Sequence, residues 1–483
     1  MKIRIKKTWI KYWLVLIVLA SHLSLTQAGP ELTQVREDFA QLYQGLKVAH
    51  PGLFWLRSEA EYDAFYESSL KELDAADTEL ARWTVFQRFV AYGGVAHARI
   101  DFPYARYDQY RTAGGKALPV YFGYDEGWII AEDFSEQGLD QGTVITHLND
   151  IDLDTWFDRA NQVLSSDTDH ISRSILKSQW PLYFWLWWEL QGEQPDRVKL
   201  SVMQDDKLQT VWVSLVDRET LSMRMESRSQ ASTARLRSLD LLPDGVAWLV
   251  PGPFYNAEDP TNVWDSTQYL TFIDDAFADI LAHNTELLVV DVRNNPGGNN
   301  SFSDPMIQWF ASEPFRFASA FWVRSSAQAA ASNQARLDSA GDADKTISLA
   351  YKEAFETVPH GQDFEYSIDW VTPREGERYE GRVVVLVNEQ SYSNAVSVAA
   401  IAQDYGFATV VGESTTDFAT TYGAMETFGL PHTGLSVGFP KALIVRPSGD
   451  RELGPVLVDV PIDNVDNFSR AQIIEKIQGA LTE

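Results

Sequence analysis

Apolar residues recur at spacings of three and four between residues 31 and 93, a pattern that predicts amphipathic helices. The first stripe runs from Leu32 to Leu46, the second from Tyr62 to Leu73 and the third from Leu80 to Val90. His50-Pro51-Gly52 ends the first stripe, because proline disfavours the helical region for the residue before it. We therefore expect an N-terminal helical region over residues 29–105.

Between residues 117 and 218 the pattern changes to short apolar runs that predict strands. The runs are Leu118 to Phe122, Gly127 to Ala131, Thr143 to Leu148, Val198 to Met203 and Thr210 to Leu215. An aromatic block at 180–188 interrupts them and is too short to span a bilayer. Since a wholly apolar helix is usually an interior one, a buried helix fits this block better than an exposed ledge that binds lipid or peptide. Residues 106–220 are therefore predicted to form a β-rich module.

From about residue 244, predicted strands alternate with predicted helices, which indicates an α/β layer architecture for residues 221–483. The strands are Val246 to Val250, Leu287 to Val292, Val383 to Val387 and Thr409 to Val411, and the helices are Ser266 to Ala282 and Asn394 to Asp404. The strand Leu287 to Val292 is apolar throughout, which is typical of a strand buried on both faces. Residues 324–362 are rich in Ala, Ser and Asp and are expected to be a mobile insertion.

Residues 1–28 have the order of parts of a secretory signal peptide. Five basic residues precede the apolar run Tyr12 to Leu19, and Thr26-Gln27-Ala28 ends the segment with a small residue. The alternative is an uncleaved anchoring helix, but Ser21, His22 and Ser24 interrupt the apolar stretch. We expect export to the periplasm or the medium, with no stable membrane span after the signal is removed.

The chain is strongly acidic, with a formal net charge of −28, and contains no cysteine. A negative surface repels phosphate backbones, so nucleic acid is not an expected partner. Without cysteine there is neither a disulfide nor a lipid-modified cysteine. The sequence also has no phosphate loop and no His-Glu-x-x-His motif, so we expect no cofactor and no metal.

Two serine motifs lack the context that their chemistry needs. Gly434-Leu435-Ser436-Val437-Gly438 resembles a nucleophile elbow, but a strand-like segment follows it where a helix is required. Ser174-Ile175-Leu176-Lys177 has no companion Lys-Thr-Gly or Ser-Asp-Asn element. Neither serine is predicted to be catalytic.

A third stretch, Asn388 to Ala395, lies where a buried strand turns into a helix and contains Ser391 and Ser393. A helix N-terminus favours developing negative charge, which suits a nucleophile, although serine is also a common helix cap. A second element, Asp291 to Asn300, follows another buried strand and contains the pair Gly297-Gly298. Such glycines either expose backbone amides as an oxyanion hole or form an ordinary tight turn.

Together these two motifs resemble those of the S41 serine peptidases, a family that includes the tail-specific, or C-terminal processing, proteases. Arg293-Asn294-Asn295-Pro296-Gly297-Gly298 is similar to the family's glycine-pair element, and Ser391 to Ala395 is similar to the start of its serine-bearing helix. The spacing back from Gln403-Asp404-Tyr405-Gly406 puts the family nucleophile on Ser393. The resemblance implies an α/β fold with a ClpP/crotonase-like catalytic core.

The chain departs from the branch of this family that uses a lysine base, because Phe418 stands at the matching position. It is similar instead to the tricorn-like branch, which uses a histidine. Gly93 to Arg99 is a degenerate form of that branch's histidine element and retains His97, and Glu452 keeps the spacing of its glutamate. Gly142 to Asp150 weakly resembles a PDZ-like signature, which implies a PDZ-like module that receives extended peptides.

The resemblance implies an exported serine-type endopeptidase that cleaves peptides or unfolded proteins through an acyl-enzyme. Its catalytic residues would be Ser393, His97 and Glu452, and its oxyanion hole would use the amides of Asn394 and Gly297 or Gly298. The alternative is a catalytically inactive member of the same fold that binds an apolar ligand or a peptide. A third, weaker possibility is a cell-envelope scaffold that uses the PDZ-like region.

Overall fold

The computed structural model describes residues 30–204, 207–229, 236–259, 261–339 and 345–481, so the predicted signal peptide lies outside the described residues. The N-terminal region consists of three helices, α1 (Leu32–Ala49), α2 (Glu59–Ala75) and α3 (Glu79–Ala91). The side chains of Ser58 and Thr78 cap α2 and α3. Each predicted apolar stripe forms a helix, and that of α1 is buried from Val35 onward, whereas Leu32 is exposed. The predicted helical region is therefore confirmed.

The next segment is the predicted β-rich module. It contains the hairpin β2 (Val120–Tyr124) and β3 (Trp128–Asp133), and a four-stranded sheet in the order β5 (Ile151–Asp152), β4 (Ile145–Leu148), β6 (Arg197–Gln204), β7 (Lys207–Ser214). Its helices are α4 (Tyr104–Thr112), α5 (Leu153–Asn161), α6 (Asp169–Gln191) and α7 (Arg218–Ser229). The aromatic block lies in α6 with Trp180, Phe184 and Trp188 buried, as predicted. The PDZ-like character of the module stays a prediction.

The α/β core is built on a six-stranded sheet. Its order is β18 (Val460–Pro461), β14 (Thr409–Gly412), β13 (Arg382–Val387), β10 (Leu287–Asp291), β9 (Val246–Val250) and β8 (Ser238–Leu242). All neighbouring strands are parallel except β8, which pairs antiparallel with β9. The predicted α/β architecture is confirmed.

Helices cover both faces of this sheet, so alternate residues of each strand enter different cores. One core joins Leu288 and Val290 to α8 (Thr267–Ala282), α9 (Asn300–Ile307) and α12 (Asn394–Asp404). The other joins Leu287 and Val289 to α13 (Arg470–Ala480). All five residues of β10 are buried, which explains its continuous apolar run. Two 3-10 turns, Pro243–Gly245 and Val465–Asn467, lie at the edges of this core.

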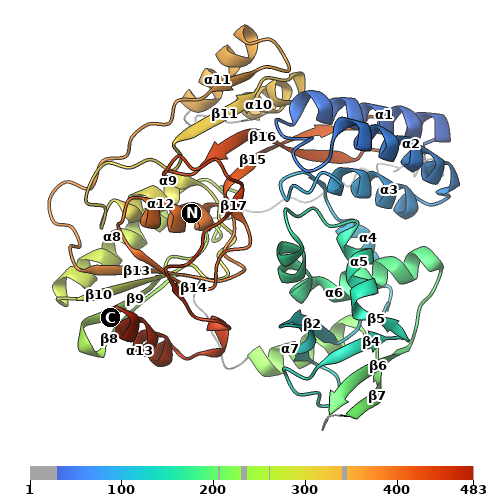
Figure 1. Cartoon of the computed structure of the whole chain (residues 1–483), viewed down its shortest axis with the longest axis horizontal. Helices are drawn as coiled ribbons and strands as arrows, with labels where there is room; N and C mark the ends of the chain where they lie inside the picture. The colour runs from blue at the N-terminus through green and yellow to red at the C-terminus, as the bar shows by residue number, and fades with distance from the viewer. Residues whose placement is uncertain (1–29, 205–206, 230–235, 260, 340–344, 482–483) are drawn as a thin grey trace, which may run out of the picture.

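A second sheet lies between the α/β core and the N-terminal helices (Figure 1). Its order is β12 (Asp363–Glu365), β11 (Ala320–Arg324), β16 (Ser436–Val445), β15 (Phe418–Gly429), β17 (Gly454–Pro455), and β1 (Arg99–Ile100) also pairs with β16. The long hairpin of β15 and β16 reaches α1, where the Phe428 ring packs against Gly45. The hairpin therefore links the helical region to the α/β core.

The segment 324–362 was expected to be a mobile insertion, but its described part is mostly helical. It forms α10 (Ala327–Ser339) and α11 (Thr346–Thr357), and α10 is tied to β15 by hydrogen bonds from Ser332 and Arg336 to Glu426. The physical reason is composition, because alanine is the strongest helix former and the segment is rich in it. Among the described residues, no helix is both long and apolar enough to cross a bilayer.

Candidate active site

Ser393 lies at a sharp turn between β13 and α12. Its φ of 53° and ψ of −117° are a conformation that costs a residue with a side chain roughly 1–3 kcal/mol. Although Ser393 is the N-cap of α12, its side chain makes no capping hydrogen bond. The half-buried hydroxyl is therefore not used to cap the helix, and it stands at the N-terminus of α12, where the unpaired amides favour negative charge.

Ser391 is different in kind, since it is fully buried and its hydroxyl is satisfied on both sides. It donates to the carbonyl of Val292 (2.8 Å) and accepts from the backbone N–H of Asn388 (3.1 Å). These bonds hold the Ser393 turn against the end of β10. Of the two serines in the motif, only Ser393 has a hydroxyl free of hydrogen bonds to other described residues.

The glycine pair packs directly against the Ser393 turn. A Cβ on Gly297 would lie 2.8 Å from the Ser393 Cβ and 2.7 Å from the backbone nitrogen of Asn394, so only glycine allows this approach. The backbone N–H of Tyr392 donates to the carbonyl of Asn295 (3.0 Å), which locks the two turns together. The two motifs that are far apart in sequence thus form one compact loop pair.

The backbone amides of these loops differ in whether they are already bonded. The N–H of Gly297 donates to Oδ1 of Asn295 (2.9 Å) and is not available to a substrate. The N–H groups of Gly298 and Asn394 make no hydrogen bond to any other described residue. Of the three predicted oxyanion-hole residues, Gly298 and Asn394 therefore have free donors, and Gly297 contributes by its lack of a side chain.

His97 lies in the loop between α3 and β1, and its ring stacks on that of Tyr392, the residue before Ser393, with centroids 5.8 Å apart. The pairing of β1 with β16 fixes the end of this loop. Burial and the charge of Arg99 lower the pKa of His97, while Asp417 acts to raise it. The His97 Nδ1 is buried and has no hydrogen-bond partner among the described residues. No hydrogen bond joins the ring to the Ser393 hydroxyl.

Asp417 is a site residue that the sequence analysis missed. It is 1% exposed, and its Oδ2 accepts the backbone N–H of Ser393 (2.6 Å) while its Oδ1 accepts that of Phe418 (3.0 Å). Burial raises the pKa of this carboxyl and the charge of His97 acts to lower it. The sequence feature that could have identified Asp417 is its position next to Phe418, which stands where the lysine-using branch of the S41 peptidases has its lysine.

Glu452 is exposed and lies two positions before β17. Its backbone N–H donates to Oδ1 of Asp450 (3.0 Å), and no interaction links its carboxylate to His97 or Ser393 among the described residues. The structure brings Ser393, His97, Asn394 and the glycine pair together, whereas the role of Glu452 stays a prediction.

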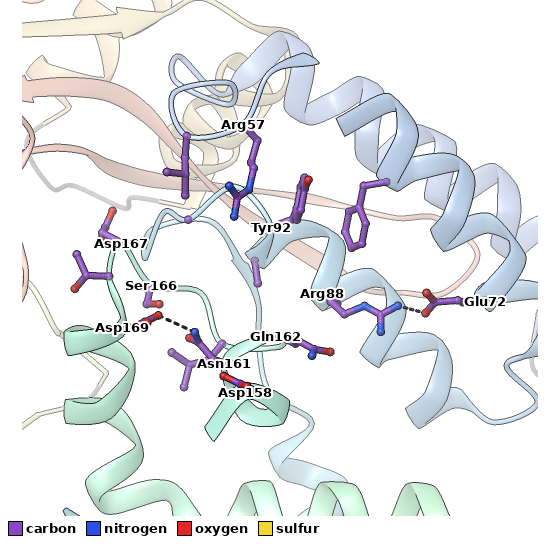
Figure 2. A pocket seen from close by; sticks show the side chains of 16 residues that line it. Arg57, Glu72, Arg88, Tyr92, Asp158, Asn161, Gln162, Ser166, Asp167 and Asp169 are labelled. Atoms are coloured by element: carbon purple, nitrogen blue, oxygen red, sulfur yellow. Dashed lines mark hydrogen bonds and ion pairs between the residues drawn. The ribbon is translucent and has the colours of Figure 1, made fainter. Parts of the chain in front are cut away.

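A cavity of about 610 Å³ opens beside the His97 loop, between α2 and α3 on one side and α5 and the start of α6 on the other (Figure 2). Gly94 and Asp167 form part of its wall, and Oδ2 of Asp167 accepts the backbone N–H of Ala96 (3.4 Å). Arg57 enters the cavity from the loop before α2, with its guanidinium 5.4 Å from the centre of the Tyr92 ring. Burial and the charge of Asp417 raise the pKa of Asp167 to about 8. The cavity thus adjoins the residue before His97.

No group of three or more His, Cys, Asp or Glu side chains suited to a metal ion occurs among the residues that the structure describes.

Solved structures share the fold of most of the chain. It resembles mature CPAF with a TM-score of 0.62 at 15% identity, covering 92% of this chain and 94% of that one. It also resembles mature CPAF complexed with lactacystin (TM-score 0.61, 15% identity, 92% and 96% covered). The photosystem II D1 C-terminal processing protease matches with a TM-score of 0.44 at 13% identity, with 91% and 96% covered.

No curated protein sequence shows a significant match to the chain. The sequence itself matches the family model described as peptidase family S41 over residues 266–460. This match contains both the glycine pair and the Ser393 turn, and the family together with the fold supports a peptidase function in general. Over residues 266–460 the chain is therefore similar in sequence to peptidase family S41.

Proposed function

We propose that this chain is an exported serine-type endopeptidase that hydrolyses peptides or unfolded proteins, with Ser393 as nucleophile and His97 as general base. The observation that carries the proposal is the Ser393 turn, which combines a strained backbone, a hydroxyl with no other bond and two free amides beside it. A strained residue of this kind persists only where the surrounding structure holds it, and such residues cluster at active sites.

In the first step the His97 ring takes the proton of the Ser393 hydroxyl while the hydroxyl oxygen forms a bond to the substrate carbonyl carbon. A lowered pKa keeps the ring neutral at neutral pH, which is the form that can accept this proton. Base assistance of this type is typically worth about a hundred- to ten-thousandfold in rate.

The carbonyl oxygen becomes an oxyanion, which the free N–H groups of Gly298 and Asn394 would receive. The Asn394 amide belongs to the first turn of α12, so the helix dipole adds to the stabilisation. Removing one oxyanion donor typically lowers kcat by about a hundred- to a thousandfold.

The intermediate then collapses by breaking the carbon–nitrogen bond, and protonated His97 gives its proton to the leaving amine. This leaves an ester between the Ser393 oxygen and the acyl part of the substrate. A water molecule repeats the sequence, with His97 taking the water's proton and returning it to the Ser393 oxygen as the carboxylic acid leaves.

A fluorophosphonate probe, which reacts with activated serines, tests the proposal. The wild-type protein should be labelled, Ser393→Ala should abolish labelling, and His97→Gln should slow it by about a hundredfold or more. Ser436→Ala is the matched control, since Ser436 lies exposed in the Gly-x-Ser-x-Gly motif and should label as wild type. A folded wild-type protein that neither labels nor cleaves an unfolded substrate such as casein contradicts the proposal.

The second candidate is an inactive binding protein of the same fold, which the lack of a hydrogen bond between His97 and Ser393 favours. Native mass spectrometry of the purified protein separates the two. A bound apolar molecule in a protein that does not label supports binding, whereas labelling at Ser393 supports hydrolysis.

A further inference from the structure

We propose that Asp417 is a positioning residue of this active site, which holds Ser393 through its backbone and stabilises the protonated ring of His97 during the reaction. This inference rests on the proposed function and assigns the acidic role to a residue other than Glu452. The geometry that carries it is the pair of backbone N–H groups, from Ser393 and Phe418, that hold the two oxygens of one buried carboxylate.

The backbone of Asp417 is held by hydrogen bonds to a neighbouring segment. Its own carbonyl accepts the hydroxyl of Thr415 (2.9 Å), and that hydroxyl in turn accepts the backbone N–H of Val456 (3.0 Å). The turn before β15 is thereby fixed to the segment that leads to β18. A carboxylate placed this way can hold the Ser393 backbone at its positive φ throughout the reaction.

Asp417 has no permanent cationic partner. No ion pair links it to a lysine or arginine among the described residues, and His97 is the charged group that acts to lower its pKa. A buried negative charge without a partner is costly, and the cost falls when a positive charge appears nearby. In the proposed reaction that positive charge is the His97 imidazolium, which forms as Ser393 attacks.

The other charged groups around His97 come from each element packed against it. Arg99 on β1 acts against the imidazolium, while Asp167, in the loop before α6, faces Asp417. Tyr392 at the elbow stacks on the ring and stays a neutral phenol, because burial and the two carboxylates raise its pKa far above the usual value.

Ionising both Asp167 and Asp417 costs free energy, because two like charges in a buried site repel each other. Burial and the charge of Asp417 raise the pKa of Asp167 to about 8, so Asp167 is mostly protonated at neutral pH. Burial raises the pKa of Asp417 as well, but the charge of His97 and the N–H groups of Ser393 and Phe418 act to lower it and so favour its ionised form. Asp167 also lines the large cavity (Figure 2).

Glu452 is placed less well for this task. Its carboxylate is exposed, no interaction links it to His97 among the described residues, and water weakens the effect of an exposed charge. Asp417 acts through a buried region in which the same charge has a larger effect. Because Asp417 is buried and Glu452 is exposed, replacing each carboxylate in turn distinguishes their effects on His97.

The experiment is an NMR titration of the His97 ring in a Ser393→Ala background, which needs no catalytic activity. Asp417→Asn should lower the pKa of His97 by about one unit or more, a tenfold change in the protonation equilibrium, whereas Glu452→Gln should leave it unchanged. In the enzyme that retains Ser393, Asp417→Asn should slow fluorophosphonate labelling by about tenfold or more and shift its acid limb to lower pH. A shift caused by Glu452→Gln and not by Asp417→Asn overturns the inference.

Asp167→Asn provides a second measurement in case Asp417→Asn does not fold, because asparagine matches the neutral form of Asp167. The His97 signal of the parent should show a second inflection near pH 8 as Asp167 ionises, and this inflection should vanish in Asp167→Asn. An inflection that persists in the variant overturns the inference. Failure of the parent enzyme to label at all would refute the proposed function while leaving both titrations interpretable.

Discussion

The backbone N–H of Ser393 donates to Oδ2 of Asp417 across 2.6 Å, joining residues that are 24 positions apart. The same turn is held from its other side by Gly297, whose missing side chain lets the chain approach the Ser393 Cβ. A serine at φ 53° and ψ −117° would relax if either contact were absent. The contacts around Ser393 therefore explain how its unfavourable backbone is kept.

Replacing Ser393 by glycine should stabilise the protein relative to Ser393→Ala. Both variants lose the hydroxyl, but glycine adopts the positive φ without strain, which is worth roughly 1–3 kcal/mol, less about 0.5–1 kcal/mol for its greater freedom when unfolded. We expect Ser393→Gly to be more stable by about 1 kcal/mol in urea denaturation. Equal or lower stability of the glycine variant would show that the turn is not strained.

Ser391→Ala should show the opposite pattern, with lower stability and retained labelling. The substitution leaves the carbonyl of Val292 and the N–H of Asn388 without their buried partner, which costs about 1–3 kcal/mol. Ser397→Ala on α12 is the control, because the Ser397 hydroxyl makes no hydrogen bond to another described residue and its loss should change stability little. Loss of labelling in a folded Ser391→Ala protein would assign Ser391 a chemical role.

Gly297→Ala should abolish labelling. Its Cβ would lie 2.6 Å from the Tyr392 carbonyl and 2.7 Å from the Asn394 nitrogen, and these are backbone atoms that cannot move without displacing the elbow. Gly449→Ala is a matched control, because Gly449 has a similar φ (86° against 82°) but no atom within 4 Å of the new Cβ. The control should carry only the backbone strain and label normally, and an equal loss in both variants would mean that strain alone is responsible.

Much of the fold could be predicted from periodicity, because burial imposes it directly. The stripe from Leu32 to Leu46 and the apolar run from Leu287 to Val292 are a helix facing one core and a strand covered on both faces. The long β15–β16 hairpin was not predicted, apart from its strand-like end at 443–445. Gly423, Gly429 and the positive φ of Ala424 break its alternation, so no strand pattern stands out in the sequence.

The site was predictable only as far as its motifs reach. The Ser393 turn and the glycine pair each follow a buried strand, so parallel pairing of β10 and β13 brings them to one edge of the sheet. The relation of Asp417 to Ser393 depends on the path of the chain between β14 and β15, which no local pattern encodes. In a chain with 68 acidic residues, a single aspartate also gives no signal by itself.

His50 should make the protein less stable in acid. It is 2% exposed, its Nδ1 accepts the N–H of Gly52 (3.0 Å), and burial together with the charge of Arg324 lowers its pKa to about 3. Below about pH 6.5 the His50 ring binds a proton in the unfolded chain, whereas in the folded protein it stays neutral down to about pH 3. The contribution of neutral His50 to the free energy of unfolding is therefore fully present above pH 6.5. Below pH 6.5 it falls by up to about 1.4 kcal/mol per pH unit.

His50→Asn should reduce this slope by up to one proton between pH 6 and 4, because its side-chain oxygen can still accept the Gly52 N–H. Urea denaturation at several pH values measures the slope. His283→Asn, at an exposed position, is the control and should keep the parent slope. An unchanged slope in His50→Asn would show that His50 is protonated in the folded protein.

The rate of labelling at Ser393 should fall with a midpoint below pH 6.5. Burial and Arg99 lower the pKa of His97 from its ordinary value, so the neutral ring that accepts the serine proton persists into mildly acid solution. All molecules carry the neutral, reactive His97 ring well above the pKa of His97 in the folded protein, and this form is lost as the pH falls through that pKa.

Arg99→Gln removes a charge that opposes the imidazolium, so it should move the midpoint of the acid limb to higher pH. His97→Gln should leave a slow rate with no such limb. A midpoint at or above pH 6.5 in the parent, or one that Arg99→Gln does not raise, would mean that a group other than His97 takes the proton.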